Sequence, residues 1–283
     1  MIVVTGATGH LGRLVIAGLL KKVPASGIVA AVRNAEKARD IAALGVQVRY
    51  ADYNQPPMWD AALKGADKVL LISSSELGQR ARQHRSVIDA AKRAGVKLLA
   101  YTSILRADTS LMGLAVEHKE TEVLIRASGI PFTLLRNSWY TENYTASISN
   151  ILAQGAVYGC AGEGRVASAG RIDYAEAAAY ALTAENQAGR VYELAGDTAY
   201  TMAELATEIS RQSGKKIGYV NMPEDGYRNV LVKAGLPEPV AAMLADSDTG
   251  ISKGALFDDG HQLSKIINRP TTSLATAVAA AMK

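Results

Sequence analysis

The chain opens with Ile2-Val3-Val4-Thr5-Gly6-Ala7-Thr8-Gly9-His10-Leu11-Gly12, in which three apolar β-branched residues lead into three evenly spaced glycines. The pattern predicts a buried strand, a tight turn and the start of a helix. Glycines let the backbone turn sharply and approach a diphosphate, which the helix N-terminus attracts. The spacing is G-x-x-G-x-x-G rather than G-x-G-x-x-G, and an ordinary glycine-rich turn is the alternative. The candidate dinucleotide-binding residues are Gly6, Ala7, Thr8, Gly9, His10, Leu11 and Gly12.

Composition excludes several classes of protein. The 283 residues contain one cysteine, so no internal disulfide can form. No apolar run approaches the ~20 residues of a membrane span, and the N-terminus lacks the pattern of an export signal. We therefore expect a cytoplasmic protein without a membrane partner. The net charge of +4 comes from 31 basic residues spread among 27 acidic ones, without a basic block, so nucleic-acid binding is not indicated.

Strand-like and helix-like segments alternate through the first half of the chain. This alternation predicts an α/β fold, a Rossmann-type doubly wound parallel sheet, with a smaller and partly interleaved C-terminal lobe. Expected strands are 2–4, 28–32, 46–50, 68–73, 96–102, 132–135 and, later, 191–194. Expected helices are 11–22, 34–44, 57–64, 79–94, 114–128, 139–154, 173–184, 202–212 and 224–234. We assign 1–136, completed by 171–195, to a cofactor-binding domain, and 137–170 with 196–283 to a substrate-binding lobe that has little parallel-strand signal.

Ligands of a doubly wound sheet lie at the carboxyl ends of its strands, so the residues that follow each strand are candidates for binding. Arg33 follows the second strand, where an acidic residue would select NAD; an arginine suits the 2′-phosphate of NADPH, although it could also be a solvated residue opening a helix. Asp52 follows the third strand and could accept from the adenine amino group or cap a helix. Small hydroxyl side chains follow the fourth strand and could bind a ribose. They are Ser73, Ser74 and Ser75.

Several segments together resemble a known family. They are Thr-Gly-Ala-Thr-Gly at the N-terminus, Val32-Arg33-Asn34, Ile72-Ser73-Ser74-Ser75 and the segment 134–143 with Arg136-Asn137-x-Trp139-Tyr140. The chain resembles the atypical short-chain dehydrogenases of the NmrA-like group, and within it the bacterial NAD(P)H:quinone oxidoreductases and triphenylmethane reductases. The resemblance covers essentially the whole chain. It implies that Gly6 to Leu11, Arg33, Ser73 to Ser75 and the segment from Asn137 contact the cofactor. It also implies that a quinone or dye-like acceptor lies against Asn137, Tyr140 and their neighbours.

The chain lacks the Tyr-x-x-x-Lys pair of most short-chain dehydrogenases. The expected register holds Leu114-x-x-x-His118 instead. An alkoxide must be protonated as it forms, whereas hydride addition to a quinone gives a phenolate, which can take its proton from water. The missing pair therefore favours a quinone or similar conjugated acceptor over a ketone. His118 is either a proton donor or a packing residue.

Asn137 and Tyr140 are the candidate catalytic residues. The Asn137 amide could donate to an acceptor oxygen as negative charge develops, or it could cap a turn. Trp139, Tyr140 and Tyr144 recur at helical spacing and would suit a flat acceptor, or pack in the core.

No metal site is predicted. The four histidines lack ligand spacing, and Asp246-x-Asp248-x-Gly250 resembles a calcium loop but has Phe257 at the position that needs a bidentate glutamate. A flavin is not required, since a nicotinamide can pass hydride directly. We therefore expect an NADPH-dependent oxidoreductase, a monomer or homodimer, that reduces quinones. The alternatives are a triphenylmethane-dye reductase and a non-catalytic, NADP-binding redox sensor.

Overall fold

The computed structural model describes all residues from Met1 to Lys283, and the chain divides into two compact units. Unit 1 comprises Met1–Ala107, Glu117–Asn137 and Arg171–Tyr192. Unit 2 comprises Asp108–Val116, Ser138–Gly170 and Glu193–Lys283. None of the helices combines the length and apolarity needed to cross a lipid bilayer.

A seven-stranded sheet with the order β3-β2-β1-β4-β5-β6-β8 forms the centre of unit 1. The pairs from β3 to β6 are parallel. The strands are β1 (Ile2–Val4), β2 (Ile28–Val32), β3 (Gln47–Tyr50), β4 (Lys68–Leu71), β5 (Leu98–Ile104), β6 (Phe132–Asn137) and β8 (Arg190–Leu194). The predicted doubly wound parallel sheet is confirmed.

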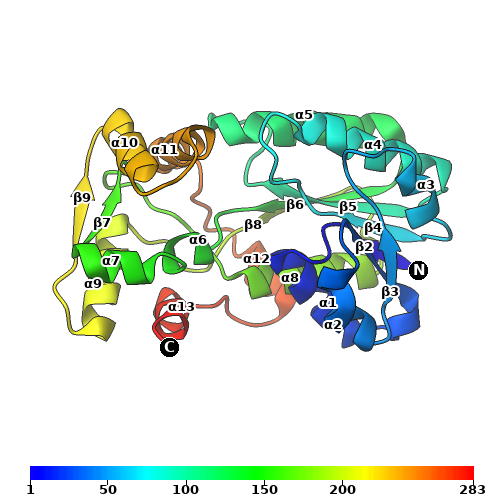
Figure 1. Cartoon of the computed structure of the whole chain (residues 1–283), viewed down its shortest axis with the longest axis horizontal. Helices are drawn as coiled ribbons and strands as arrows, with labels where there is room; N and C mark the ends of the chain where they lie inside the picture. Colours follow the sequence, from blue (N-terminus) through cyan, green and yellow to red (C-terminus); the bar gives the residue numbers. More distant parts are fainter. The chain divides into compact units, whose positions relative to one another are not determined.

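Helices cover both faces of this sheet (Figure 1). One face carries α3 (Met58–Ala62), α4 (Arg80–Arg93) and α5 (Gly113–Ser128), and the other carries α1 (His10–Leu20), α2 (Arg39–Ala43) and α8 (Arg171–Thr183). Two 3-10 turns, η1 (Ala25–Gly27) and η2 (Glu36–Ala38), complete the unit. β1 and β2 are apolar throughout because both of their faces are covered, and every residue of these two strands is buried.

The strand order reverses between β1 and β4, and this reversal defines where a ligand can bind. Two adjacent strands whose crossover helices leave in opposite directions open a crevice at their carboxyl ends. The glycine turn follows β1, and Ser73 to Ser75 follow β4. The sheet topology therefore brings these two sequence-predicted segments to the same edge.

Unit 2 contains a second, parallel sheet of two strands, β7 (Ala156–Gly159) and β9 (Gly218–Asn221). Its helices are α6 (Glu142–Thr145), α7 (Ile148–Gln154), α9 (Met202–Ser213), α10 (Glu224–Lys233), α11 (Glu238–Ser252), α12 (Gln262–Ile267) and α13 (Leu274–Ala281). A capping box between Thr201 and Glu204 starts α9, and Gly214, with φ of 69°, ends it.

Three expectations for this half of the chain are wrong. The β7–β9 sheet was not predicted, and the single helix expected over 139–154 is two short helices, α6 and α7. Tyr140 lies outside both, because the backbone at Trp139 and Thr141 pairs with Ala169. Trp139, Tyr140 and Tyr144 therefore do not share one helix. In unit 1, the helix expected over 34–44 is reduced to η2 and α2.

Candidate cofactor and acceptor sites

The glycine turn has the backbone geometry that a diphosphate needs. Gly6 has a φ of 57°, a left-handed conformation that favours glycine. A Cβ on Gly12 would lie 2.5 Å from the Gly6 carbonyl oxygen, so only glycine permits this close approach. Gly9 is exposed and occupies the N-cap position of α1, so no side chain covers this end of the helix. The first turn of α1 contains no acidic residue. The Ala7 and Gly9 N–H groups donate to the Ala31 and Gly6 carbonyls. The donors that suit an anion are therefore the N–H groups at the start of α1, which have no intrahelical acceptor.

The other residues of the turn divide between packing and exposure. Ala7 and Leu11 are buried and anchor the turn on the core, whereas His10 is exposed. The Thr8 carbonyl accepts a hydrogen bond from Arg13 Nε at 3.2 Å. A cradle of main-chain donors, with no room for a Cβ at Gly12, fits the diphosphate of a dinucleotide.

Tyr53 joins three strand ends beneath this turn. Its hydroxyl oxygen lies 2.6 Å from both Thr5 Oγ1 and the Ile72 carbonyl oxygen, and the Ile72 N–H donates to Thr5 Oγ1 at 2.9 Å. Burial raises the pKa of the Tyr53 phenol well above its usual value, so it stays neutral. The contacts fix the segment after β1 against the segment after β4.

Arg33 follows β2 with an exposed guanidinium, as expected for a group that receives a 2′-phosphate. Its Nη1 lies 3.2 Å from Oε1 of Glu76, a residue that the sequence reasoning missed. Glu76 also accepts hydrogen bonds from Asn54 Nδ2 at 3.3 Å and Gln83 Nε2 at 2.7 Å. These hydrogen bonds, above all the one from Asn54, lower the pKa of Glu76. The Glu76 carboxylate is therefore anionic at neutral pH.

Asp52 follows β3 and forms a local turn. Its Oδ1 accepts the Asn54 N–H at 2.9 Å, and its carbonyl accepts the Trp59 indole N–H at 2.9 Å. The side chain does not cap a helix, because α3 begins after Pro57 without a side-chain cap. Its Oδ1 is used in the local turn, and Oδ2 has no such contact and could accept from an adenine.

Buried side chains hold the serine loop after β4. The Ser73 N–H donates to Thr102 Oγ1 at 2.8 Å, and the Ser74 N–H donates to His84 Nε2 at 2.9 Å. Because Nε2 accepts, the His84 proton is on Nδ1, which donates to Thr121 Oγ1 at 2.9 Å. Burial lowers the pKa of His84 to about 3, which keeps the ring neutral. Sequence reasoning considered His84 only as a possible metal ligand and missed this role.

Asn137 ends β6 with an unsatisfied acceptor. The side chain is 5% exposed, and its Oδ1 is buried and accepts no hydrogen bond from the protein. Buried polar atoms of this kind are rare and indicate a missing partner. A donor on a bound molecule, such as the carboxamide N–H of a nicotinamide, would satisfy this oxygen.

A buried ion pair fixes the strand next to Asn137. Arg136 Nη2 and Nε lie 2.7 and 2.9 Å from the two carboxylate oxygens of Glu122 on α5. Ser103 donates to the same carboxylate at 2.6 Å. A bidentate pair of this type allows little rotation, so the end of β6 is rigid.

His118 is a packing residue of unit 1. It is 5% exposed, and its Nδ1 lies 2.8 Å from the Tyr101 hydroxyl. Burial lowers the pKa of His118 well below its usual value. The neutral ring is thus held by a buried tyrosine, which favours the packing interpretation over the proton donor.

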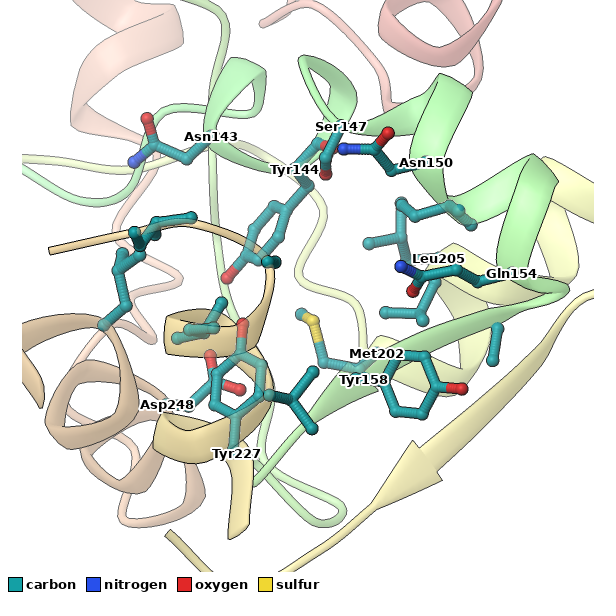
Figure 2. A pocket seen from close by; sticks show the side chains of 18 of the residues that line it. Asn143, Tyr144, Ser147, Asn150, Gln154, Tyr158, Met202, Leu205, Tyr227 and Asp248 are labelled. Atoms are coloured by element: carbon teal, nitrogen blue, oxygen red, sulfur yellow. The ribbon is translucent and has the colours of Figure 1, made fainter. Parts of the chain in front are cut away.

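Unit 2 contains a cavity of about 250 Å³ beside the segment that carries Trp139 and Tyr144 (Figure 2). Trp139, Asn143 and Tyr144 line it, whereas Tyr140 does not. The Tyr144 and Tyr227 hydroxyls point toward one another beside Asp248. The wall is otherwise largely aliphatic, so the cavity suits an apolar molecule with one polar end.

Comparisons with known proteins agree with this geometry. The chain is 56% identical over 278 residues to Quinone oxidoreductase 2 of Escherichia coli (strain K12). The aligned region covers 98% of this chain and 97% of that protein. The crystal structure of an NADPH-dependent quinone oxidoreductase from Escherichia coli, complexed with NADPH, has a TM-score of 0.98 and 55% identity over 100% of both chains. The crystal structure of Citrobacter sp. triphenylmethane reductase complexed with NADP(H) has a TM-score of 0.95 and 42% identity over 99% of this chain and 100% of that one. Residues 1–276 match the model of the NmrA-like family, and the chain belongs to that family, as its sequence motifs indicated.

Proposed function

We propose that this chain is an NADPH-dependent oxidoreductase that transfers hydride to a quinone or a similar conjugated acceptor. The observation that carries the proposal is the full-length likeness, at 56% identity, to a quinone oxidoreductase. The chain has the glycine turn, Arg33 and Asn137 with an unsatisfied Oδ1, which suit the diphosphate, the 2′-phosphate and the nicotinamide end of NADPH.

We assign cofactor binding to unit 1 and acceptor binding to unit 2. The glycine turn Gly6–Gly12 would hold the diphosphate through the N–H groups at the start of α1, Arg33 the 2′-phosphate and Ser73–Ser75 the ribose. Asp52 would accept from the adenine through Oδ2. Asn137 ends a rigid strand and would orient the nicotinamide or the acceptor oxygen. NADPH supplies the hydride when bound, and quinone, NADPH and one proton give hydroquinone and NADP⁺.

The protein need not supply that proton from a dedicated acid. Hydride addition to a quinone gives a phenolate that resembles the tyrosine phenolate, whose conjugate acid has a pKa of ~10. This anion persists long enough to be protonated by water. This agrees with the absence of a Tyr-x-x-x-Lys pair and with His118 being neutral, buried and bound to Tyr101. The chain's contribution is binding, orientation and exclusion of water.

The test is steady-state oxidation of NADPH with 1,4-naphthoquinone, followed by the absorbance of NADPH, with hydroquinone measured as the product. We expect one hydroquinone for each NADPH oxidised. NADPH binding without turnover with any quinone would refute the enzymatic assignment and favour the redox sensor.

Reduction of triphenylmethane dyes is a second candidate activity. The likeness to Citrobacter sp. triphenylmethane reductase, at a TM-score of 0.95, favours it. NADPH-dependent bleaching of a cationic triphenylmethane dye tests it in the same assay. Loss of dye colour that requires NADPH supports the activity, and a dye that stays coloured while quinone is reduced excludes it.

A further inference from the structure

The cavity of unit 2 has a distinct chemical character. Its 19 lining residues include aromatic and aliphatic side chains, several neutral amides and hydroxyls, one carboxylate and no basic residue. The volume of about 250 Å³ is close to the low end of the range found for small-molecule sites. A cavity of this composition accommodates an apolar ring but offers nothing to neutralise a negative charge.

Tyr144 lines this cavity and has an unused hydrogen-bond donor. Its hydroxyl oxygen is buried and has no hydrogen-bond partner in the protein. Its ring is fixed by an edge-to-face contact with Tyr200, with centroids 6.4 Å apart. Burial, followed by the charge of Asp248, raises the pKa of Tyr144 well above its usual value. The hydroxyl therefore keeps its proton at every ordinary pH and lacks only an acceptor.

Asp248 places a carboxyl group beside this hydroxyl (Figure 2). It lies on α11, is 7% exposed and accepts the Cys160 N–H through Oδ2 at 3.0 Å. Burial raises the pKa of Asp248 to about 6, so the group is mostly a carboxylate at pH 7 and above.

The groups that face Asp248 are all neutral or acidic. One group lies on α6, one in the segment that follows β7, one on β9 and one on α10. The acidic Glu224 accepts a hydrogen bond from Thr249, the residue next to Asp248. The facing groups are Tyr144, Cys160, Tyr219 and Tyr227. The charge of Asp248 contributes to the raised pKa of each of them. No lysine, arginine or histidine lines the cavity to offset its charge.

We propose that this cavity binds the uncharged ring of the acceptor, that one acceptor oxygen receives the Tyr144 hydrogen bond, and that Asp248 discriminates against anionic acceptors. The proposal rests on the proposed function, because it specifies which quinones the enzyme accepts. A carbonyl oxygen satisfies the buried hydroxyl, and the ring fills the apolar wall. A sulfonated or carboxylated quinone would bring a second negative charge into a low-dielectric cavity, which is strongly unfavourable.

Calorimetric binding in the absence of NADPH tests the hydrogen bond. We expect Tyr144→Phe to weaken 1,4-naphthoquinone binding by about 10-fold, the effect of one hydrogen bond. Naphthalene, which has no oxygen, should bind both proteins equally. Tyr192→Phe is the matched control, since it removes a hydroxyl that donates to Gln187 in unit 1. Equal affinities of Tyr144→Phe and the wild type for the quinone would overturn the proposal.

Thermal unfolding separates binding from a structural role. Because the Tyr144 hydroxyl has no partner, its removal should leave the melting temperature of the ligand-free protein unchanged or raise it. Naphthoquinone should then raise the melting temperature of Tyr144→Phe less than that of the wild type. A Tyr144→Phe protein that melts clearly lower without ligand would show a structural role and contradict the assignment.

Asp248→Asn and pH test the charge discrimination. At pH 8 we expect 1,4-naphthoquinone-2-sulfonate to bind at least about 10-fold more weakly than 1,4-naphthoquinone. The difference should shrink in Asp248→Asn, and in the wild type below pH 6, where Asp248 is protonated. A difference that is the same in both proteins would refute this role.

These measurements also separate the proposal from the proposed function. Quinone binding that depends on Tyr144, without NADPH oxidation, would refute the enzymatic function and leave the binding site in place. Turnover with unchanged quinone affinity and KM in Tyr144→Phe would support the function and refute this site.

Discussion

The Arg33 guanidinium is paired with the Glu76 carboxylate, with 3.2 Å between Nη1 and Oε1. The two side chains are 62% and 41% exposed, so solvent screens the pair and its net strength is small. A phosphate dianion can therefore displace Glu76 and form a stronger, bidentate contact with Arg33. The position expected to bind the 2′-phosphate thus holds both an attractive and a repulsive group.

Arg33→Ala should weaken NADPH binding while leaving NADH binding nearly unchanged. Loss of a charge-assisted contact costs about 1.5–3 kcal/mol, which corresponds to about 10- to 100-fold in affinity. Titration of both cofactors into both proteins measures the effect. If wild-type affinities for NADPH and NADH were equal, the NADPH preference assigned to Arg33 would be wrong.

Glu76→Gln should strengthen NADPH binding by about three-fold or more, because it removes a negative charge that competes for Arg33. The amide keeps the size of the side chain and can still accept from Asn54 and Gln83. NADH affinity serves as the internal control, since NADH lacks the 2′-phosphate. A uniform gain for both cofactors would show that Glu76 acts elsewhere.

Gly9→Val should abolish nucleotide binding in a protein that still folds. Gly9 is exposed and has ordinary backbone angles, with φ of −73°. A Cβ there would lie 3.2 Å from the Gly6 carbonyl oxygen, a close contact that a small shift relieves, and it would place a branched side chain on the diphosphate surface. Gly27→Val is the control, because a Cβ there meets nothing within 4 Å. Circular dichroism and the thermal shift caused by NADPH are the measurements, and a shift retained in Gly9→Val would place the site elsewhere.

The sequence predicts unit 1 better than unit 2, for a physical reason. β1 and β2 were predicted residue for residue because strands buried on both faces are continuous apolar runs. β7, with the sequence Ala-Val-Tyr-Gly, has one β-branched residue and ends in glycine, and the four residues of β9 are largely exposed, so neither has such a run. Their pairing joins segments about sixty residues apart and depends on tertiary packing.

The candidate site shows the same division. The glycine turn and the serine loop are local patterns at strand ends, and the sequence identifies them. Glu76 and His84 act on groups brought together by the fold, and nothing in their local sequence indicates those partners. The sequence around Asp248 indicates only an incomplete calcium loop, because its burial beside Tyr144 requires α11 to pack against other elements of unit 2.

Acid should destabilise the protein through His84. Its folded-state pKa of about 3 lies below the unfolded value of about 6.5, so only the unfolded state binds a proton between these values. The contribution of neutral His84 to the free energy of unfolding is fully present above pH 6.5 and is lost as the pH falls toward 3. His84 alone should lower the free energy of unfolding by about 2 kcal/mol between pH 7 and pH 5. Denaturant unfolding measures this change, and His84→Gln should reduce the pH slope; an identical slope in the variant would contradict the assignment.

Asn137→Ala should reduce turnover with quinone more than it weakens NADPH binding. In the proposed role, the Asn137 Nδ2–H group donates to an acceptor oxygen as that oxygen becomes negative. Such a contact acts mainly in the transition state, so its loss lowers kcat. Removing such a donor can lower kcat by ~100-fold, but a hydroquinone anion is resonance-stabilised, so we expect a loss nearer ~10-fold.

His118→Ala is the comparison: it removes the buried contact with Tyr101 and should lower stability while leaving turnover of the folded protein close to that of the wild type. Rates at saturating NADPH decide between the two residues. A large loss of kcat in His118→Ala with none in Asn137→Ala would reverse the assignment, because the histidine would then have to supply the proton despite its burial and lowered pKa.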